Sequence, residues 1–386
     1  MAGLTFDWLA AVNEQPQKKD WPDGLLQQQQ SALSTLKEWQ APNRKLEFWR
    51  YSDATRLKKD ILGHEGKAVE APIHHQSVVI NLTENEVQQP ADIPDWLQIK
   101  PIQAADQPVW SALEQRPELV VQATNQALFS HGVALSVSAD APQDATIVLR
   151  YAADEANQWT FVRNLISVAA NAEVIVDEQV IAGRINVNNF YQLGDNARLK
   201  RYQNVVLADD QQHVALQHFT LADESHVTSQ NRHEGGDLQH HVHWVDFTGE
   251  NAEYQSGSIN KAGGQSHISD IVVVNHNHKN NRSEVIHRSL ADDSAQIFNN
   301  ARALVAKGAD GSEIEQDLKN ILLANGAKIA SKPELEVYAD EVIAAHGSTI
   351  GTLDEEAIFY LQSRGIPAKT AREMMMVSFE QEAQIC

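Results

Sequence analysis

The sequence has almost no cysteine and no long hydrophobic run. Cys386, the last of 386 residues, is the only cysteine, which excludes a disulfide framework within the chain, a CxxC redox motif and a cysteine zinc site. Apolar runs such as Ile271–Val274 are far shorter than the ~20 residues that cross a bilayer. The first residues include Asp7 and no basic segment, unlike a secretory signal peptide. We therefore expect a cytoplasmic protein without a membrane partner.

Positive charge is also in deficit. The chain has 31 lysines and arginines against 52 aspartates and glutamates, a net charge of −21. Such a field repels a phosphate backbone, so we expect no nucleic-acid partner. Common catalytic signatures are missing as well, because there is no HExxH, no Walker A loop and no GxSxG elbow. The nearest approach to the elbow, Gly347–Gly351, has Thr349 at its centre.

What the sequence does contain, from about Leu119 onward, is a degenerate repeat of short β-branched runs separated by turns. Each unit has a turn residue followed by a small residue, any residue and an apolar residue. The small residues are Ala172, Ala197, Ser225, Ala252, Ala295 and Ala327. The successive offsets are 25, 28, 27, 43 and 32 residues, and we interpret the longer ones as units that hold insertions.

A repeat of this length with only 6% aromatic residues favours a β-solenoid, in which stacked coils share one aliphatic core. A β-sandwich with irregular turns is the alternative at this point. A solenoid has ladder edges at both ends, and these edges need a cover. We therefore expect a β-solenoid core over residues 116–350, between an N-terminal helical and irregular domain, residues 1–115, and a C-terminal helical domain, residues 351–386.

The C-terminal domain has the signals of two helices. Thr352 and Glu355 form a capping box for the first helix. Gly365 is placed to end that helix, and Pro367 can occupy the first turn of the second. The second helix should end near Phe379.

Two pairs of histidines are spaced as i and i+2. His241 and His243 would share one face of a strand, and they resemble the start of a cupin metal motif. The acidic residue expected shortly afterwards is missing. His276 and His278 form the second pair. A metal-dependent cupin-like or β-helix enzyme that uses His241 and His243 is one hypothesis, and solvated residues on the outer face of a solenoid are the favoured interpretation.

Two further features lie near the C-terminus. His346 sits at the junction between the repeat and the terminal helices, where a lone histidine is usually a hydrogen-bonded structural residue. Met374, Met375 and Met376 are the only methionines besides Met1, and at least one must face outward from a helix. Methionine suits adaptable contact surfaces, so partner docking and packing within the terminal domain both stay open for these three.

Two segments match a known family. Residues 332–379, KPELEVYADEVIAAHGSTIGTLDEEAIFYLQSRGIPAKTAREMMMVSF, resemble the C-terminal signature of the SufB/SufD family of iron–sulfur cluster assembly proteins. Residues 42–57, PNRKLEFWRYSDATRL, resemble an N-terminal segment of the SufD members. The resemblance therefore covers both ends of the chain and implies that the repeat between them is a right-handed parallel β-helix.

The resemblance also implies a function and partners. Family members form a complex in which SufB and SufD pair through their β-helices, and the ATPase SufC binds their C-terminal domains. The complex builds nascent iron–sulfur clusters from sulfur that a SufE-type carrier delivers. We therefore expect a non-catalytic scaffold subunit that binds no cofactor tightly by itself. A homodimer could form when the chain is produced alone.

One position departs from the family pattern. Many members carry Cys-x-His in the signature, whereas this chain has Ala344 where the cysteine would be and keeps the histidine, His346. The departure favours the SufD side of the family over SufB. It implies that His346 completes a nascent-cluster site at the SufB interface, with sulfur from a SufB cysteine. Cys386 fits the role of sulfur acceptor poorly.

The resemblance further implies where the ATPase docks. The expected docking surface lies on the two terminal helices. Its residues are Tyr360, Leu361, Arg364, Gly365, Ile366, Met374, Met375 and Met376.

Overall fold

The computed structural model describes most of the chain. The described residues are 21–39, 42–58, 77–83, 86–105, 116–153 and 159–385. The expectations that involve Asp7 and Cys386 fall outside these ranges.

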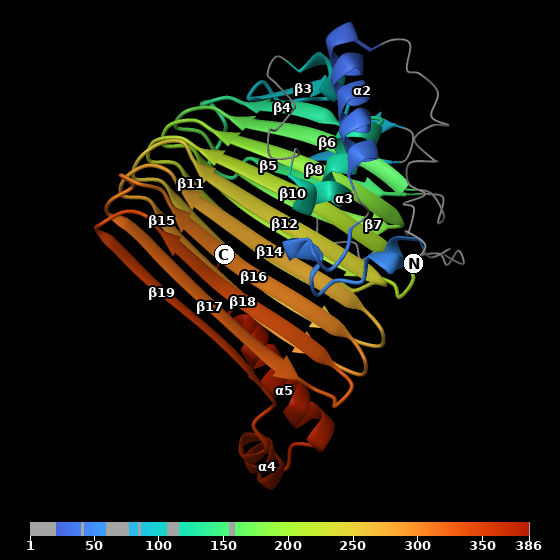
Figure 1. The fold of residues 1–386 in the computed structure, drawn as a ribbon, viewed down its shortest axis with the longest axis vertical. Coiled ribbons are helices and arrows are strands. Elements are labelled where there is room, and N and C mark those ends of the chain that lie inside the picture. Colours follow the sequence, from blue (N-terminus) through green and yellow to red (C-terminus); the bar gives the residue numbers. More distant parts are fainter. Residues whose placement is uncertain are drawn as a thin grey trace.

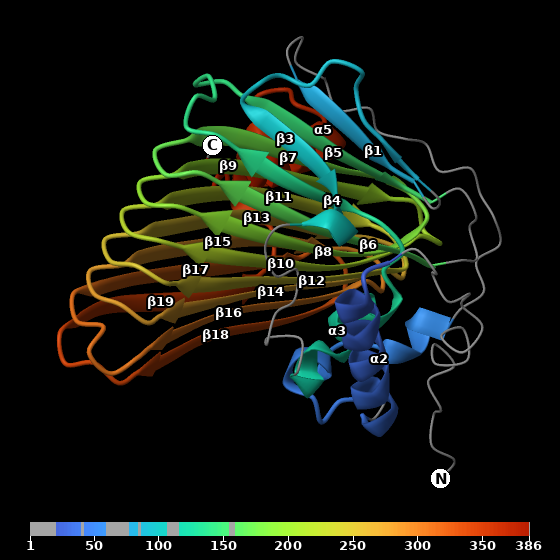
Figure 2. The same ribbon diagram turned by 90° about the horizontal axis from the view of Figure 1, so that it is seen from above.

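The centre of the molecule is a β-solenoid made of two facing sheets (Figures 1 and 2). The ten-stranded sheet contains, in spatial order, β19 (Val342–Gly351), β17 (Ser312–Leu322), β15 (Arg282–Ala291), β13 (Glu253–Ala262), β11 (His226–Gly235), β9 (Arg198–Leu207), β7 (Glu173–Ala182), β5 (Thr146–Ala152), β1 (Val78–Leu82) and β2 (Val87–Gln88). The nine-stranded sheet contains β18 (Lys328–Val337), β16 (Gln296–Val305), β14 (His267–His276), β12 (Leu238–Phe247), β10 (Gln212–Leu221), β8 (Arg184–Leu193), β6 (Trp159–Val168), β4 (Val133–Val137) and β3 (Leu97–Pro101). The predicted solenoid is confirmed.

Each coil contributes one strand to each sheet, and successive coils pair in parallel. The repeat signature marks the turn at which a strand of the solenoid begins. Asn171, Asn196 and Asn251 have positive φ in these turns, a conformation that asparagine tolerates better than most residues. The small residue that follows each of them, such as Ala197, is buried. The turn chemistry therefore sets the start of each coil.

The interpretation of the long offset as an insertion is wrong. Ala252 precedes β13 in the ten-stranded sheet, whereas Ala295 precedes β16 in the nine-stranded sheet. The offset of 43 residues therefore spans one and a half coils, because the signature moves from one sheet to the other. The coil between these two positions also has a turn with positive φ, at Asn280, but the sequence there does not match the repeat signature.

The N-terminal part is less helical than predicted, because three of its segments are strands. β1 adds to β5 in parallel, and β3 adds to β4 antiparallel, so both sheets extend into this region. The 3-10 segments are η1 (Glu47–Trp49), η2 (Ala54–Lys58), η3 (Ile102–Ala104) and η5 (Pro117–Leu119). The expected helix is present as α2 (Asp23–Glu38).

The N-terminal elements cover the outer face of the nine-stranded sheet. α3 (Val120–Leu128) is buried along its whole length and contacts β6, β8 and β10. α2 packs on α3 from the solvent side (Figure 2). The Trp49 ring, fully buried, stacks on the imidazole of His240 in β12, with centroids 4.2 Å apart. This face of the solenoid is therefore closed by the chain itself.

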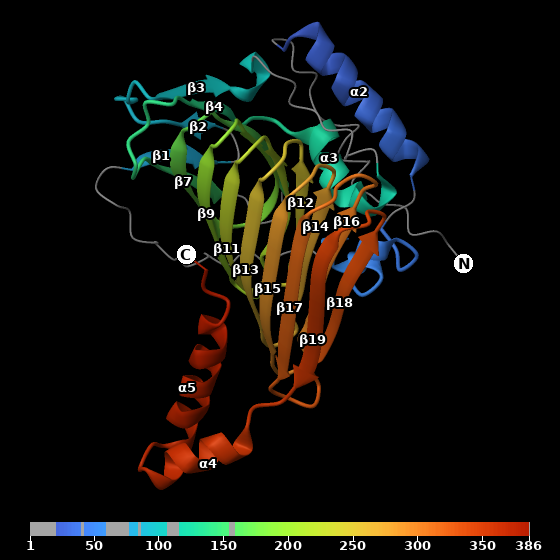
Figure 3. The ribbon, with the colours of Figure 1, turned by 90° about the vertical axis from the view of Figure 1, so that its left-hand side faces the viewer.

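Two helices end the chain, α4 (Glu355–Ser363) and α5 (Ala368–Gln381), as predicted. The predicted capping box is wrong, because Thr352 is not the N-cap residue of α4. Asp354 is the N-cap, and its Oδ1 accepts hydrogen bonds from the amides of Glu356 and Ala357 at 2.9 and 3.1 Å. Gly365 follows α4 with a φ of 88°, so it occupies the left-handed C′ position expected of it. Figure 3 shows α4 projecting beyond the solenoid and α5 returning beside the ten-stranded sheet.

Candidate functional site

His346 lies in the middle of β19, the last strand of the ten-stranded sheet. In the register, His346 is opposite Gln316 and Ala344 is opposite Ile314, both buried on the inner side of β17. Parallel in-register strands repeat their facing, so Ala344 and His346 lie on the inner side of the last coil. His346 is nevertheless exposed, because no further coil of the described chain covers it.

Polar groups surround this open end. The Oγ of Ser348, two residues beyond His346, lies 2.8 Å from the Oγ of Ser331 in β18. The Gln316 side chain donates across the interior to the carbonyl of Glu334 in β18, at 3.3 Å. The inner side of the last coil therefore offers one imidazole among hydroxyl and amide groups.

An ion-pair cluster ties this coil to the N-terminal segment. Lys332 Nζ lies 2.6 Å from a carboxylate oxygen of Glu47 and 2.8 Å from one of Glu334. The hydrogen bond from Lys332 lowers the pKa of Glu47. The two segments that resemble the family signature, far apart in sequence, therefore meet on the structure at the Lys332–Glu47 pair.

The terminal helices expose an apolar face. Phe359, Tyr360, Met374 and Val377 are 71%, 57%, 47% and 52% exposed. Met375 and Met376 are partly buried against a small core of Leu353, Ile358 and Ala371, and so are Leu361 and Ile366. The expectation that at least one methionine faces outward is confirmed by Met374. Arg364 and Gly365 are exposed. Phe359 and Val377 are not among the residues predicted from sequence. Val377 lies at i+3 from Met374 and could have been identified by helical spacing, whereas Phe359 lies at neither i+3 nor i+4 from a predicted residue.

The interior of the solenoid holds a second polar cluster. Glu178 and Arg201, 1% and 0% exposed in their side chains, form an ion pair with 2.6 Å between Oε1 and Nε. Gln203 and Gln217 donate to the other oxygen of Glu178 at 3.2 and 3.0 Å, and Tyr191 donates to Oε1. This carboxylate has a full set of partners.

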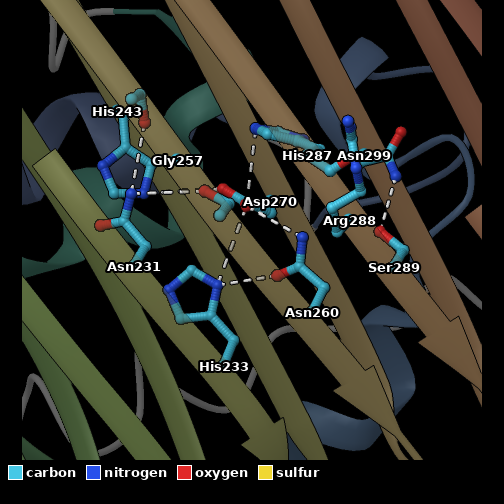
Figure 4. Close-up of polar contacts among 12 residues, drawn as sticks. Asn231, His233, His243, Gly257, Asn260, Asp270, His287, Arg288, Ser289 and Asn299 are labelled. Atoms are coloured by element: carbon cyan, nitrogen blue, oxygen red, sulfur yellow. Dashed lines mark hydrogen bonds and ion pairs between the residues drawn. The ribbon is translucent and has the colours of Figure 1, made fainter. Parts of the chain in front are cut away.

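Asp270, from β14, lies further along the same interior among three imidazoles (Figure 4). The imidazole nitrogens of His243, His287 and His233 lie 3.6, 3.7 and 3.8 Å from its carboxylate oxygens. These separations are too long for hydrogen bonds. Among the described residues, Asp270 accepts a hydrogen bond from the side-chain amide of Asn260, at 3.1 Å (Figure 4).

The histidine pair His241 and His243 is therefore not on a solvated outer face, and that favoured interpretation is wrong. Both side chains are fully buried inside the solenoid. The His241 ring stacks on His233 with centroids 3.7 Å apart. The acidic side chain nearest to His243 is Asp270, which comes from the next coil rather than from the local sequence. His276 and His278 form no site together, because His276 is buried beside Ser283 and His278 is exposed.

Burial dominates the protonation of this interior. It lowers the pKa of His213 to about 3, with help from the positive charge of Arg201 and from His233. Burial also lowers the pKa of His241 well below its usual value. Burial would raise the pKa of Asp270, but the three imidazoles and the Asn260 amide hold it well below its usual range. At neutral pH the buried imidazoles are therefore neutral and the Asp270 carboxylate is ionised.

Neither cluster is a preformed metal centre. Among the described residues, no three histidine, cysteine, aspartate or glutamate side chains are arranged to hold a metal ion. The three imidazoles of the Asp270 cluster approach its carboxylate from different directions (Figure 4). None of the helices described is both long and apolar enough to cross a membrane.

The fold and the open end define a class of protein: a parallel β-solenoid with a helical pair at the end of its last coil. Comparisons with known proteins give the family. The family model for the SufBD core domain of the SUF system of FeS cluster assembly matches residues 150–379, more than half of the chain. The chain belongs to the SufB/SufD family of iron–sulfur cluster assembly proteins.

The relatives agree with this membership. Iron-sulfur cluster assembly protein SufD of Escherichia coli is 26% identical over 262 residues, which are 67% of this chain and 54% of that protein. A SufBD family protein of Synechocystis is 24% identical over 409 residues, covering 97% of this chain and 90% of the relative. The match to the Escherichia coli protein thus spans about half of its length. The comparisons bring no support to the metal-dependent enzyme hypothesis.

Proposed function

We propose that the chain is a non-catalytic scaffold subunit of an iron–sulfur cluster assembly complex and pairs with a SufB-type subunit through its last coil. The observation that carries the proposal is the open end of the solenoid. β18 and β19 are the last strands of the two sheets, and β19 is exposed over nearly its whole length. The apolar residues exposed there are Val337, Tyr338, Ile343 and Ile350. A long uncovered edge with apolar side chains is a template for strands of another chain.

His346 contributes a nitrogen ligand to a nascent cluster at this interface. The support is its exposure on the inner side of the last coil, where a partner coil would enclose it. Imidazole is a suitable ligand for iron, and thiolate is the commoner one. Ala344 offers no thiolate on that face, so the thiolate comes from the SufB-type partner. The iron and sulfur are cargo of the complex, delivered in part by a SufE-type carrier.

The experiment is His346→Ala in the complete complex. Cluster formation, followed by visible absorbance after iron and sulfide donors are added, should fall severalfold. Because His346 is exposed, the free energy of unfolding of the chain should change by less than about 0.5 kcal/mol. His278→Ala, an exposed histidine in a distant turn, is the matched control and should leave assembly unchanged. Wild-type cluster formation by an intact His346→Ala complex would refute the role.

The terminal helices dock a SufC-type ATPase. The support is the exposure of four large apolar side chains on the two helices, Phe359, Tyr360, Met374 and Val377. Flanking residues Arg364, Leu361, Gly365, Ile366, Met375 and Met376 complete the surface. Buried aromatic anchors within a polar rim are typical of interface centres.

Two variants separate the two interfaces. Phe359→Asp should abolish co-purification with the ATPase and retain the SufB-type subunit. Ile350→Asp, on the last coil, should have the opposite effect. Loss of both partners from either variant, with the chain still folded, would contradict the placement. Produced alone, the chain is expected to form a homodimer through the same edge, which Ile350→Asp should make monomeric.

A further inference from the structure

The C-terminal end of α5 returns to the outer wall of the ten-stranded sheet (Figure 3). Glu380, in the last turn of α5, lies 3.1 Å from Arg232 of β11 and 3.6 Å from Lys261 of β13. Glu382, the C-cap, lies 3.0 Å from Arg288 of β15 and 3.1 Å from Lys319 of β17. Two carboxylates at the helix end therefore bridge four cations from four successive coils.

The sign of these charges is informative. The C-terminus of a helix carries partial negative charge, so acidic side chains there oppose the helix dipole. Glu380 and Glu382 would favour fraying of α5 in isolation, and only the cations of the wall reverse that effect. Burial would raise the pKa of Glu382, but the hydrogen bonds and charges of Lys319 and Arg288 lower it. The end of α5 is thus built to be held against the sheet.

The wall is also shaped for the backbone that follows the helix. A Cβ atom added to Gly257 of β13 would lie 2.1 Å from the carbonyl oxygen of Ala383. Ala383 is fully buried, and the amide of Ile385 donates to the Gln230 side chain at 3.0 Å. We call the wall residues Gln230, Arg232, Gly257, Lys261, Arg288 and Lys319 the C-terminal seat.

Arg288 is the centre of the seat. It is 2% exposed, and besides Glu382 it binds the Asp317 carboxylate of β17 at 2.7 Å. Its Nη1 donates to the carbonyl of His287, at 3.0 Å. The side chain of His287 points to the other side of β15, toward Asp270. Arg288 therefore joins α5 to two coils of the wall, and its neighbour in β15, His287, belongs to the interior cluster.

The two attachments of the helical pair differ in kind. Near the last coil, Leu353, Ile358 and Ala371 form an apolar core that includes Ile321 of β17. At the seat the contacts are mainly ion pairs. The side chains of Glu382 and Lys319 are 46% and 43% exposed, whereas those of Glu380 and Arg288 are 12% and 3% exposed. Exposed ion pairs weaken with salt and contribute little individually, whereas apolar packing does not depend on screening. The seat is therefore the attachment that salt weakens at its exposed pairs, whereas the apolar core near the last coil is not screened.

We infer that the C-terminal seat is a releasable anchor, which holds α5 against the wall and fixes the docking surface relative to the last coil until a partner draws the helices away. Glu380 and Glu382 are its positioning residues. The identity of the partner rests on the proposed function, but the anchor itself does not. Intramolecular interfaces this polar are typical of elements that move relative to each other.

Hydrogen exchange of the chain alone tests the anchor. In the double variant Glu380→Gln/Glu382→Gln, amides of residues 378–385 should exchange at least tenfold faster than in the wild type. Raising the salt concentration should accelerate exchange at the same residues of the wild type to a similar extent. Glu355→Gln breaks the exposed Arg372–Glu355 pair between α4 and α5, 2.7 Å long, and is the matched control. The control should leave exchange at residues 378–385 unchanged.

Gly257→Val tests the same seat without altering charge. The added side chain must displace Ala383, so it should raise exchange at residues 378–385 as the glutamine variants do. Wild-type protection in both the double variant and Gly257→Val would overturn the anchor. Unfolding midpoints equal to wild type would show that the wall itself is intact.

Release is tested by adding the SufC-type ATPase with ATP to the wild-type chain. Exchange at residues 378–385 should rise toward that of the double variant, while amides of α4 become more protected. If the ATPase binds and residues 378–385 stay as protected as in the chain alone, release is refuted. If the ATPase does not bind at all, the proposed docking function fails while the exchange results on the chain alone still decide the anchor.

Discussion

The carboxylate of Asp270 lies 3.6 Å from Nε2 of His243 inside the solenoid, and neither group is exposed. Two further imidazoles stand at similar distances, and none reaches hydrogen-bond distance. Several of their ring nitrogens, including both of His243, have no hydrogen-bond partner among the described residues. The interior is therefore polar but incompletely paired, so its stability depends on which of these groups carry protons.

The buried histidines make the protein sensitive to acid. Burial lowers the folded-state pKa of His213 to about 3, and of His240, His267 and His276 to about 4. In the unfolded chain these histidines bind protons near pH 6.5, whereas in the folded chain they stay neutral down to about pH 4. The free energy of unfolding is therefore fully retained above pH 6.5 and falls as the pH decreases from about 6.5 toward 4. Each of these histidines should lower the free energy of unfolding by about 1 kcal/mol at pH 5.5.

Urea unfolding at pH 7.5 and 5.5 measures this loss. His276→Gln should reduce the difference between the two pH values by about 1 kcal/mol. The exposed His278→Gln should not change it. Equal free energies of unfolding at the two pH values in wild type would contradict the prediction.

The Glu178–Arg201 pair should be the most sensitive point of the interior. Glu178→Gln leaves the buried Arg201 charge without its counter-ion, and we expect a loss of about 3–5 kcal/mol in the free energy of unfolding. Glu373→Gln, which breaks the exposed pair with Lys369, is the control and should change stability by less than about 0.5 kcal/mol. Equal effects of the two substitutions in denaturant titrations would show that Arg201 finds another partner or solvent.

Trp49 anchors the N-terminal segment on the solenoid. Because its ring is fully buried on His240, Trp49→Ala should cost about 3–5 kcal/mol. Tyr51→Ala, which removes an aromatic ring that is 48% exposed beside Phe298, should cost much less. Proteolysis of residues 42–58 should accelerate in Trp49→Ala and not in Tyr51→Ala. Similar proteolysis in the two variants would argue against this anchor.

The cap of α4 is tested by Asp354→Ala. Its carboxylate accepts from two amides of the first turn, so the change should destabilise the helix start by about 1 kcal/mol. Exchange at Glu356 and Ala357 should then be severalfold faster. Thr352→Ala, at the residue chosen from sequence, should leave these amides unaffected, and the reverse result would restore the sequence-based cap.

Periodicity and turn chemistry were sufficient to predict the solenoid and the terminal helices, because both are written in residues close together in sequence. The Asp270 cluster was not predictable in this way. His233, His243 and Asp270 come from three different strands, and their meeting depends on the register between coils rather than on local spacing. The same limit applies to β1 and β3, whose strand conformation is imposed by the sheet edges that they cover. His346 was singled out by resemblance, and only the register with Gln316 shows which way it faces.

The one-to-one register between successive coils has a consequence for how this fold can change. Each coil pairs only with its two neighbours, so the strand pairing by itself does not fix the number of coils. Duplicating a coil between β12, where Trp49 is anchored, and β18 would move Lys332 away from that anchor by one strand spacing, roughly 4.8 Å, and leave both ends chemically unchanged. Glu47 and Lys332, now 2.6 Å apart, would then be separated. The pair can therefore form only with the present number of coils between β12 and β18.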